Sequence, residues 1–274
     1  MPVSLIEAVV VNHNTSTFTE LAVRSLLAMH SDTLDVAMTI LDNASTDNTN
    51  ALRAYAAASD IPYQQSGFNT ESSVNTHGEV LRAFVLNHPD PAYYLLLDSD
   101  ICFIQPNTLL TMQHELDTHD QAFAIQPRMT WDGETEMPGA GWHIAEDNPL
   151  HYRSHLADQP ISDVELVRKG SSSCGTLRPR CHPGCTLVKN TPIFRRVAEH
   201  IGFSTAWLYG EAQPISGFYD TFALACQVMK THNQCYLLSS AMVLHFFCVS
   251  YDLTGMEWKQ QVCQERLQLL RTQD

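Results

Sequence analysis

The pattern of apolar and polar residues predicts alternating strands and helices in the first half of the chain. Short apolar runs bounded by polar or turn-forming residues indicate strands, which we place at 5–11, 38–41, 61–65, 93–97 and 121–126. Between them apolar residues recur at helical spacing, and we place helices at 17–29, 48–58, 77–88 and 106–117. This alternation is typical of βαβ units, which build a parallel sheet covered by helices.

The second half of the chain has a different character. Residues 128–183 contain Gly, Pro, Trp, His and Asp without a clear period, so we expect irregular structure that is functional or mobile. Regular elements then resume, with strands at 185–189, 235–238 and 241–245 and helices beginning at Pro192 and covering 218–231 and 256–271. The whole pattern predicts an α/β fold with a mostly parallel, Rossmann-like sheet flanked by helices and a smaller second region.

The composition is that of an ordinary globular protein. Of 274 residues, 44% are hydrophobic and 17% are charged, which suffices for a packed core. The formal net charge of -14 argues against a nucleic-acid partner, because a duplex binder needs a basic face. Residues 1–11 lack the basic start of a signal peptide, and no apolar run approaches the roughly 20 residues of a spanning helix. We therefore expect a cytoplasmic protein without an integral membrane segment.

Cys174, Cys181, His182 and Cys185 offer a zinc site as one interpretation. Their spacing is irregular and lacks the paired Cys-x2-Cys units of structural zinc sites, so this interpretation is the weaker one. Without a secretory signal, the eight cysteines are better interpreted as buried thiols than as a disulfide framework.

Polar residues end three of the predicted strands. Residues 12–14, 42–43 and 98–100 read Asn-His-Asn, Asp-Asn and Asp-Ser-Asp, and each follows an apolar run. In open α/β sheets ligands bind at the carboxyl ends of the strands, so we expect these clusters to converge on one cleft. Each cluster alone is equally well explained as a strand terminator or a helix cap. Three clusters on successive strands favour a binding site.

The segment 98–100 is the strongest candidate for chemistry. Two carboxylates separated by one residue directly follow the apolar run Tyr-Tyr-Leu-Leu-Leu, and they can face one divalent cation where the chain turns. Mg²⁺ and Mn²⁺ prefer carboxylate oxygens and leave coordination positions open for substrate phosphates. Such an ion neutralises charge on a diphosphate leaving group. The sequence therefore predicts a metal site at Asp98 and Asp100.

Three segments carry a family resemblance: Val9–Asn14, Ile40–Asp47 and Leu95–Asp100. In order and separation they resemble the successive motifs of family 2 glycosyltransferases with the GT-A fold, and Asn69–Gly78 is similar to a variant of the family's Asn/Gly-rich segment. The resemblance covers residues 5–126 and continues more loosely over 182–250. It implies that residues 1–127 form a nucleotide-sugar-binding half and that residues 128–274 form an acceptor-binding and catalytic half of the same domain.

The resemblance implies a role for each motif. Asp42 would contact the nucleotide base, the backbone from Asn12 to Thr15 would line the base and ribose pocket, and Asp98 would lie near the ribose and the metal. Asp100 would bind the metal. The donor-binding residues implied in this way are Asn12, Asn14, Asp42, Asn69, Asp98 and Ser99.

The resemblance also implies a catalytic base in the second half. Residues 217–221 precede an apolar helix and resemble the family's acidic motif, in which a carboxylate often serves as general base. Tyr219 stands where many members have Glu, so Asp220 alone matches. A helix cap is the alternative role of Asp220, and Glu211 is the second candidate for the base.

His245, at the end of an apolar strand, is a reasonable third metal ligand. The family often has a His at this point followed by Ser, and Ser250 fits that pattern. In the irregular segment, the residues that could shape the acceptor site or a lid are Asp132, Glu134, Trp142 and His143.

Together these features predict an enzyme that moves a sugar from a nucleotide-diphosphate donor, with a UDP-sugar favoured, to an acceptor hydroxyl. Mn²⁺ or Mg²⁺ would stabilise the leaving group and Asp220 would activate the acceptor, with inversion favoured over retention. A sugar nucleotidyltransferase is less favoured, because residues 12–15 lack a Gly-rich basic phosphate loop. A non-catalytic nucleotide- or carbohydrate-binding module is less favoured because the acidic residues are present. The expected partners are a nucleotide sugar, a hydroxyl-bearing acceptor and a second copy of the chain in a homodimer.

Overall fold

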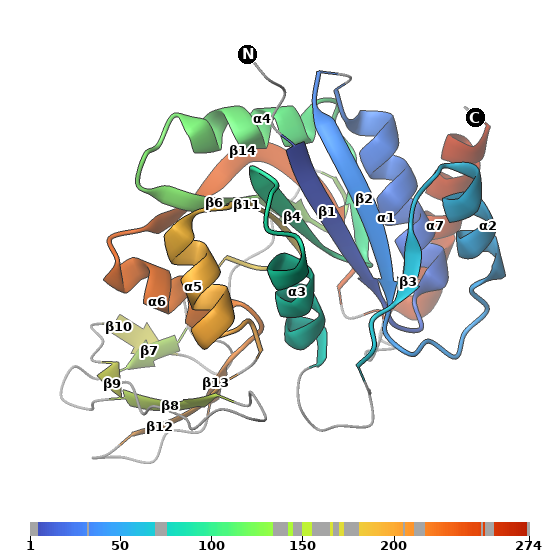
Figure 1. Cartoon of the computed structure of the whole chain (residues 1–274). Coiled ribbons are helices and arrows are strands. Elements are labelled where there is room, and N and C mark those ends of the chain that lie inside the picture. Colours follow the sequence, from blue (N-terminus) through green and yellow to red (C-terminus); the bar gives the residue numbers. More distant parts are fainter. Residues whose placement is uncertain are drawn as a thin grey trace.

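The computed structural model gives the fold of most of the chain (Figure 1). It describes residues 5–31, 33–68, 76–133, 142–144, 150–154, 165–166, 170–172, 181–204, 206–210, 217–247, 249 and 255–272. Among the helices in these ranges, none has both the length and the apolar character that a membrane crossing requires.

An eight-stranded sheet forms the centre of the molecule. In spatial order its strands are β3 (Tyr63–Gln65), β2 (Asp35–Asp42), β1 (Leu5–Asn12), β4 (Tyr93–Asp98), β11 (Cys185–Lys189), β6 (Ala122–Thr130), β14 (Cys235–His245) and β5 (Ile101–Phe103). The pairs β3–β2, β2–β1, β1–β4 and β6–β14 are parallel, whereas β11 is antiparallel to both its neighbours and β5 is antiparallel to β14. The prediction of a mostly parallel sheet is therefore confirmed.

The link between β4 and β5 determines where the site forms. Only Ser99 and Asp100 separate the end of β4 from Ile101 at the start of β5, yet β5 pairs with β14 at the far end of the strand order. The sheet must therefore curl to bring these two regions together. The register of β14 and β5 aligns His245 with Ile101, so the curl places His245 beside Asp100.

Helices cover both faces of the sheet, as predicted (Figure 1). They are α1 (Ser16–Met29), α2 (Asn50–Ala58), α3 (Thr76–Asn87), α4 (Thr108–Asp117), α5 (Pro192–His200), α6 (Ala223–Thr231) and α7 (Met256–Arg271). α1, α2 and α4 pack in one apolar core with Ile6 and Val10 of β1, whereas α3, α5 and α6 pack in a second core with Val9. This division follows from the alternation of side chains along a strand. α7 packs against α1 in a third cluster that contains Leu21 and Leu267.

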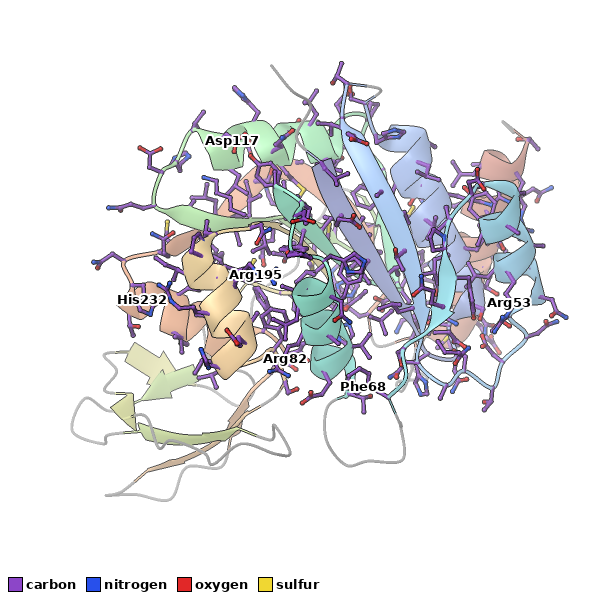
Figure 2. The ribbon with its side chains drawn as sticks, viewed as in Figure 1. Arg53, Phe68, Arg82, Asp117, Arg195 and His232 are labelled. Atoms are coloured by element: carbon purple, nitrogen blue, oxygen red, sulfur yellow. The ribbon has the colours of Figure 1, made fainter. Side chains whose placement is uncertain are left out.

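Two arginines fix α3 against α5 (Figure 2). Arg82 of α3 donates to the Ala198 carbonyl at 2.7 Å, at the carboxyl end of α5. Arg195 of α5 in return donates to the Val85 carbonyl at 3.0 Å, in the last turn of α3, and to the Tyr94 hydroxyl at 2.8 Å. The last carbonyls of a helix lack intrahelical partners, and cationic side chains satisfy them well. The two arginines therefore hold α3 in one position against α5.

Short strands form two small sheets in and after the segment that we expected to be irregular. The strands are β7 (Trp142–Ile144), β8 (Leu150–Ser154), β9 (Glu165–Leu166), β10 (Gly170–Ser172), β12 (Ala206–Gly210) and β13 (Gly217–Tyr219), paired as β10-β7 and β13-β12-β8-β9. Figure 1 shows them together at the lower left, beside α5 and α6. The expectation of irregular structure over 128–183 was wrong where β7, β8, β9 and β10 lie, because runs of two to five residues contain too few alternations to show a period.

The helix predicted at 218–231 begins later, at Ala223. Residues 217–219 form β13 instead, so Asp220 lies in the turn between β13 and α6. The two strands predicted on either side of residue 240 are the single strand β14, whose register with β6 shifts between Leu238 and Met242.

Both predicted halves of the chain contribute to the large sheet. The boundary placed after residue 127 lies inside β6, and β11 of the second half stands between β4 and β6. The two halves therefore share one core, and the separate roles assigned to them remain a prediction.

Candidate functional site

The carboxyl ends of β1, β2 and β4 lie side by side at one edge of the sheet. The strand register aligns Asn12 with Asp42 and Val11 with Asp98. The three polar clusters that end these strands therefore converge, at the edge where open α/β sheets bind ligands.

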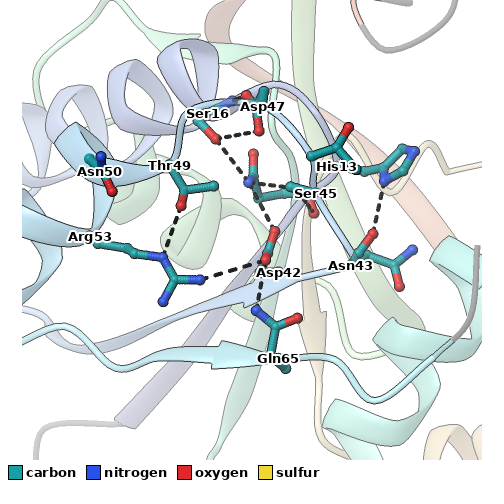
Figure 3. Close-up of polar contacts among 12 residues, drawn as sticks. His13, Ser16, Asp42, Asn43, Ser45, Asp47, Thr49, Asn50, Arg53 and Gln65 are labelled. Carbon is teal, nitrogen blue, oxygen red and sulfur yellow. Dashed lines mark hydrogen bonds and ion pairs between the residues drawn. The ribbon is translucent and has the colours of Figure 1, made fainter.

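Asp42 lies in a network of side-chain donors (Figure 3). Its Oδ1 accepts from Asn12 Nδ2 at 3.2 Å and its Oδ2 from Gln65 Nε2 at 2.8 Å, and Arg53 Nη2 lies 3.9 Å from Oδ2. Only 2% of Asp42 is exposed. Burial acts to raise the pKa of the Asp42 carboxyl, but hydrogen bonds, with that from Ser45 the largest, outweigh it and hold the pKa below its ordinary value. Asp42 is therefore a fixed, ionised acceptor.

Asn12 is the hub of this network. Besides Asp42, its Nδ2 donates to Ser16 Oγ at 3.2 Å and to Ser45 Oγ at 2.9 Å, and its Oδ1 accepts from Thr19 Oγ1 at 2.8 Å. The residue is fully buried. Its side chain is therefore occupied in orienting Asp42, and a contact of Asn12 with a donor would come from its backbone.

Asn14 joins the loops that follow β1 and β2. It is exposed, has a left-handed φ of 56°, and its Oδ1 accepts from the backbone N–H groups of Thr46 at 2.6 Å and Asp47 at 3.3 Å. The Asp47 carboxylate accepts in turn from the Ser16 backbone N–H at 2.9 Å, at the start of α1. An oxygen that satisfies an N–H of the first helical turn stabilises the helix. Both loops are thus held in place before any ligand binds.

Asp98, Asp100 and His245 form an acidic centre at the same edge. One ligand atom of each lies within 4.8 Å of those of the other two, and His245 Nε2 is 3.1 Å from Asp100 Oδ1. Asp100 and His245 are buried, with 4% and 3% exposed, whereas Asp98 is half-buried. Ser99 Oγ accepts from the Thr15 hydroxyl at 2.8 Å, which ties the centre to the loop after β1.

The two carboxyl groups of this centre have pKa values shifted in opposite directions. Burial raises the pKa of Asp98, nearby His77 lowers it and the Asp100 carboxylate raises it again, so that it lies above its ordinary value. Burial also acts to raise the pKa of Asp100, but His245 and the backbone N–H of Val249 bring it below its ordinary value. A divalent cation would favour the ionised form of both groups.

The geometry of the centre fits such a cation. Neighbouring ligands of an octahedral Mg²⁺, with bond lengths of about 2.1 Å, lie about 3 Å apart. The 3.1 Å between His245 Nε2 and Asp100 Oδ1, which form a hydrogen bond in this structure, is compatible with this separation. Carboxylate oxygens with one imidazole suit Mn²⁺ as well. Among the described residues, one group of three His, Cys, Asp or Glu side chains lies close enough to hold one metal ion, and it consists of Asp98, Asp100 and His245.

Two histidines that the sequence pattern did not connect with this centre flank Asp98. His77 Nε2 lies 3.3 Å from Asp98 Oδ1, and His182 Nδ1 lies 3.8 Å from Oδ2. His182 Nδ1 accepts the Gly184 N–H at 2.9 Å, so it does not donate to Asp98. A Cβ on Gly184 would lie 2.7 Å from His182 Nδ1 and 3.0 Å from Asp98 Oδ2, so this close approach requires glycine. The sequence carried no local signal for these contacts, because they depend on tertiary packing.

Asp220 lies close enough to the acidic centre for its charge to shift the pKa of Asp98. Burial is the main cause of the raised pKa of Asp98, and the charge of Asp220 adds to it. The Asp220 carboxylate also accepts from the backbone N–H of Thr221 at 2.8 Å.

Asp132 accepts from the Thr130 hydroxyl at 2.9 Å, at the end of β6. Outside the described residues lie Asn69, Glu134, Glu211 and Ser250, and the side chains of Trp142 and His143.

The described cysteines are free thiols. Cys181 and Cys185 are fully buried; Cys181 Sγ contacts Thr186 Oγ1 at 3.3 Å, and Cys185 belongs to the apolar core. Burial raises the pKa of the Cys185 thiol far above its ordinary value, which disfavours the thiolate that a zinc site needs. Cys174 lies outside the described residues.

Comparison with known proteins identifies the fold. No family model and no curated protein sequence matches the chain. Among solved structures, a mannosyltransferase from Pyrobaculum calidifontis in complex with GDP-Man and Mn²⁺ aligns over 89% of this chain and 57% of its own, with 11% identity and a TM-score of 0.52. Glucosyl-3-phosphoglycerate synthase from Mycobacterium tuberculosis in complex with phosphoglyceric acid aligns over 46% of this chain and 44% of its own, with 21% identity and a TM-score of 0.36.

The mannosyltransferase provides the basis for the fold assignment. Its similarity extends over most of this chain, which itself spans 57% of the length of that protein. At 11% identity the similarity shows the fold alone. The prediction of a GT-A fold is confirmed: the chain shares the α/β fold of this mannosyltransferase.

Proposed function

We propose that the chain is a metal-dependent glycosyltransferase that moves a sugar from a nucleoside-diphosphate donor to an acceptor hydroxyl. The observation that carries this proposal is the acidic centre of Asp98, Asp100 and His245 at the carboxyl edge of a GT-A sheet. The mannosyltransferase of the same fold was solved with GDP-Man and Mn²⁺, which agrees with such a donor. We favour a UDP-sugar and take a GDP-sugar as the second candidate.

Each polar cluster has one task in this proposal. The acidic centre would hold Mn²⁺ or Mg²⁺, which when bound neutralises charge on the departing diphosphate. Asp42 would accept a hydrogen bond from an N–H of the base, and Asn12 orients it. Asn14 and Ser99 support the loops on the ribose and phosphate side, and Asn69 would add a further donor contact.

Asp220 would act as the general base. Its carboxylate would take the proton of the acceptor hydroxyl while that oxygen attacks the anomeric carbon from the face opposite the diphosphate, which inverts the centre. Two features support this role. Asp220 lies in a turn that leaves it partly exposed, and it is close enough to Asp98 for its negative charge to raise the pKa of that carboxyl.

Titration calorimetry tests the donor site. We expect one of UDP, GDP and TDP to bind at least about tenfold more tightly with Mn²⁺ than without it, because Asp98, Asp100 and His245 would hold an ion whose charge would offset that of the diphosphate. Asp100→Ala should abolish this difference. Glu199→Ala, which removes an exposed carboxylate paired with His200 at the end of α5, should leave it unchanged. If the wild-type protein binds no nucleotide in a metal-dependent manner, the proposal is wrong.

Asp220→Asn separates donor binding from transfer. The amide cannot accept the proton, so we expect transfer to fall by about 10²–10⁴-fold while nucleotide affinity stays within about twofold. Donor turnover with a panel of nucleotide sugars and acceptors measures the first quantity, and calorimetry measures the second. Transfer at the wild-type rate would leave Asp220 with the role of a turn and helix-start residue only.

A further inference from the structure

An exposed tryptophan stands beside the acidic centre. The parallel register of β6 and β14 pairs Thr130 with Leu244, so the residues that come next along the two strands, Trp131 and His245, lie at the same edge of the sheet. Trp131 is 44% exposed, although an aromatic side chain of this size is usually mostly buried. Its ring centroid lies 5.4 Å from that of Phe247, which lies 3.6 Å from that of His245. One aromatic ring thus separates Trp131 from the centre.

Backbone contacts hold this aromatic pair in position. Phe247 has a left-handed φ of 55°, which is uncommon for a residue other than glycine and marks a constrained position. Its carbonyl accepts from Lys259 Nζ at 2.6 Å. On the other strand, Thr130 Oγ1 donates to Asp132 Oδ1 at 2.9 Å across the residue that carries the indole. The residues on either side of Trp131 and the ring that it packs against are therefore held in place, which favours the indole as a contact surface.

We propose that Trp131 is a stacking platform for a pyranose ring of the acceptor. One face of a pyranose presents C–H bonds that pack against a flat aromatic ring, and its hydroxyls point outward to polar groups such as Asp132. Phe247 and His245 connect the platform to the acidic centre. The attacking hydroxyl of the acceptor would have to reach this centre. This inference rests on the proposed function and narrows it, because it names a sugar as the acceptor class.

Saturation-transfer NMR with simple pyranosides in place of the complete acceptor tests the platform. The probes are the methyl pyranosides of glucose, galactose, mannose and N-acetylglucosamine, with Mg²⁺ and either UDP or GDP present. We expect at least one probe to receive saturation, mainly at the protons of one ring face. Trp131→Ala should reduce this transfer at least about fivefold and Trp131→Phe should retain most of it, because a smaller flat ring still stacks.

Two controls locate the bound sugar. Trp258→Ala removes a tryptophan of similar exposure, 46%, from α7 and should leave the transfer unchanged. Replacing Mg²⁺ by paramagnetic Mn²⁺ should broaden the resonances of the bound pyranoside in the wild-type protein, since the platform lies next to the centre that would hold the ion.

Nucleotide titration of the same variants keeps the two proposals apart. Trp131→Ala should bind UDP or GDP with Mn²⁺ as the wild type does. Normal nucleotide binding together with undiminished saturation transfer in Trp131→Ala, or with no pyranoside bound by the wild type, overturns the platform alone. Absence of metal-dependent nucleotide binding in the wild type overturns the proposed function, while the comparison of Trp131→Ala with wild type still decides whether a sugar stacks there.

Discussion

At the scale of single residues, Asp42 combines burial with a fixed charge. A buried carboxylate is costly unless donors satisfy it, and here Asn12 and Gln65 each donate to one of its oxygens. The group is therefore oriented before a ligand arrives, so that binding does not have to order it. The same hydrogen bonds make the charge of Asp42 part of the stability of the fold.

Asp42→Asn should therefore destabilise the protein in a pH-dependent way. The amide of the new Asn would point an NH₂ group at Asn12 or Gln65, which donate to the carboxylate in the wild type. The loss of that hydrogen bond should lower the free energy of unfolding by about 1–3 kcal/mol. Because the pKa of Asp42 is lowered in the folded state, its stabilising contribution is present above the unfolded value of about 3.9 and is lost as the pH falls through the folded value. Urea unfolding should give a larger difference from wild type at pH 7 than at pH 3, and an equal difference would show that the charge contributes nothing.

At the scale of elements, the sequence predicted the long elements and the local part of the site. Apolar runs located β1, β2 and β4 to within a few residues, and with them the polar clusters at their ends. The three residues of β5 and the short strands of the small sheets had too little length to show a period. The contacts of His77 and His182 with Asp98 could not be predicted, because they arise from the position of α3 and from the pairing of β11 with β4.

Arg195→Ala should loosen α3 and thereby test how that position is held. The guanidinium satisfies the Val85 carbonyl and the Tyr94 hydroxyl, so its loss should cost about 1–3 kcal/mol in the free energy of unfolding. Arg196→Ala is the matched control, since this neighbour is exposed and surface substitutions usually change stability by less than about 0.5 kcal/mol. Equal effects of the two substitutions in urea unfolding would contradict the capping role of Arg195.

At the scale of the whole molecule, the acidic centre connects distant parts of the chain. Asp98 ends β4, Asp100 lies in the link from β4 to β5, and His245 ends β14 in the second half. The curled sheet alone brings them within reach of one another, so the site exists only in the folded state. A ligand that binds this centre must therefore stabilise the complete fold rather than one element, because it binds the folded chain and not the unfolded one.

Mn²⁺ and the preferred nucleotide together should therefore raise the melting temperature. At 100 times its dissociation constant a ligand stabilises the folded state by about 2.7 kcal/mol. For a chain of this size, a stabilisation of that magnitude corresponds to about 5–10 °C. Asp100→Ala should lose the increase. Arg195→Ala should have a lower melting temperature without ligand but show the same increase on binding, because its defect lies outside the acidic centre. Circular dichroism measures the melting temperature of each variant. An increase of the same size in Asp100→Ala would place the bound ion elsewhere and would contradict the role of Asp100 in the centre that connects β4, β5 and β14.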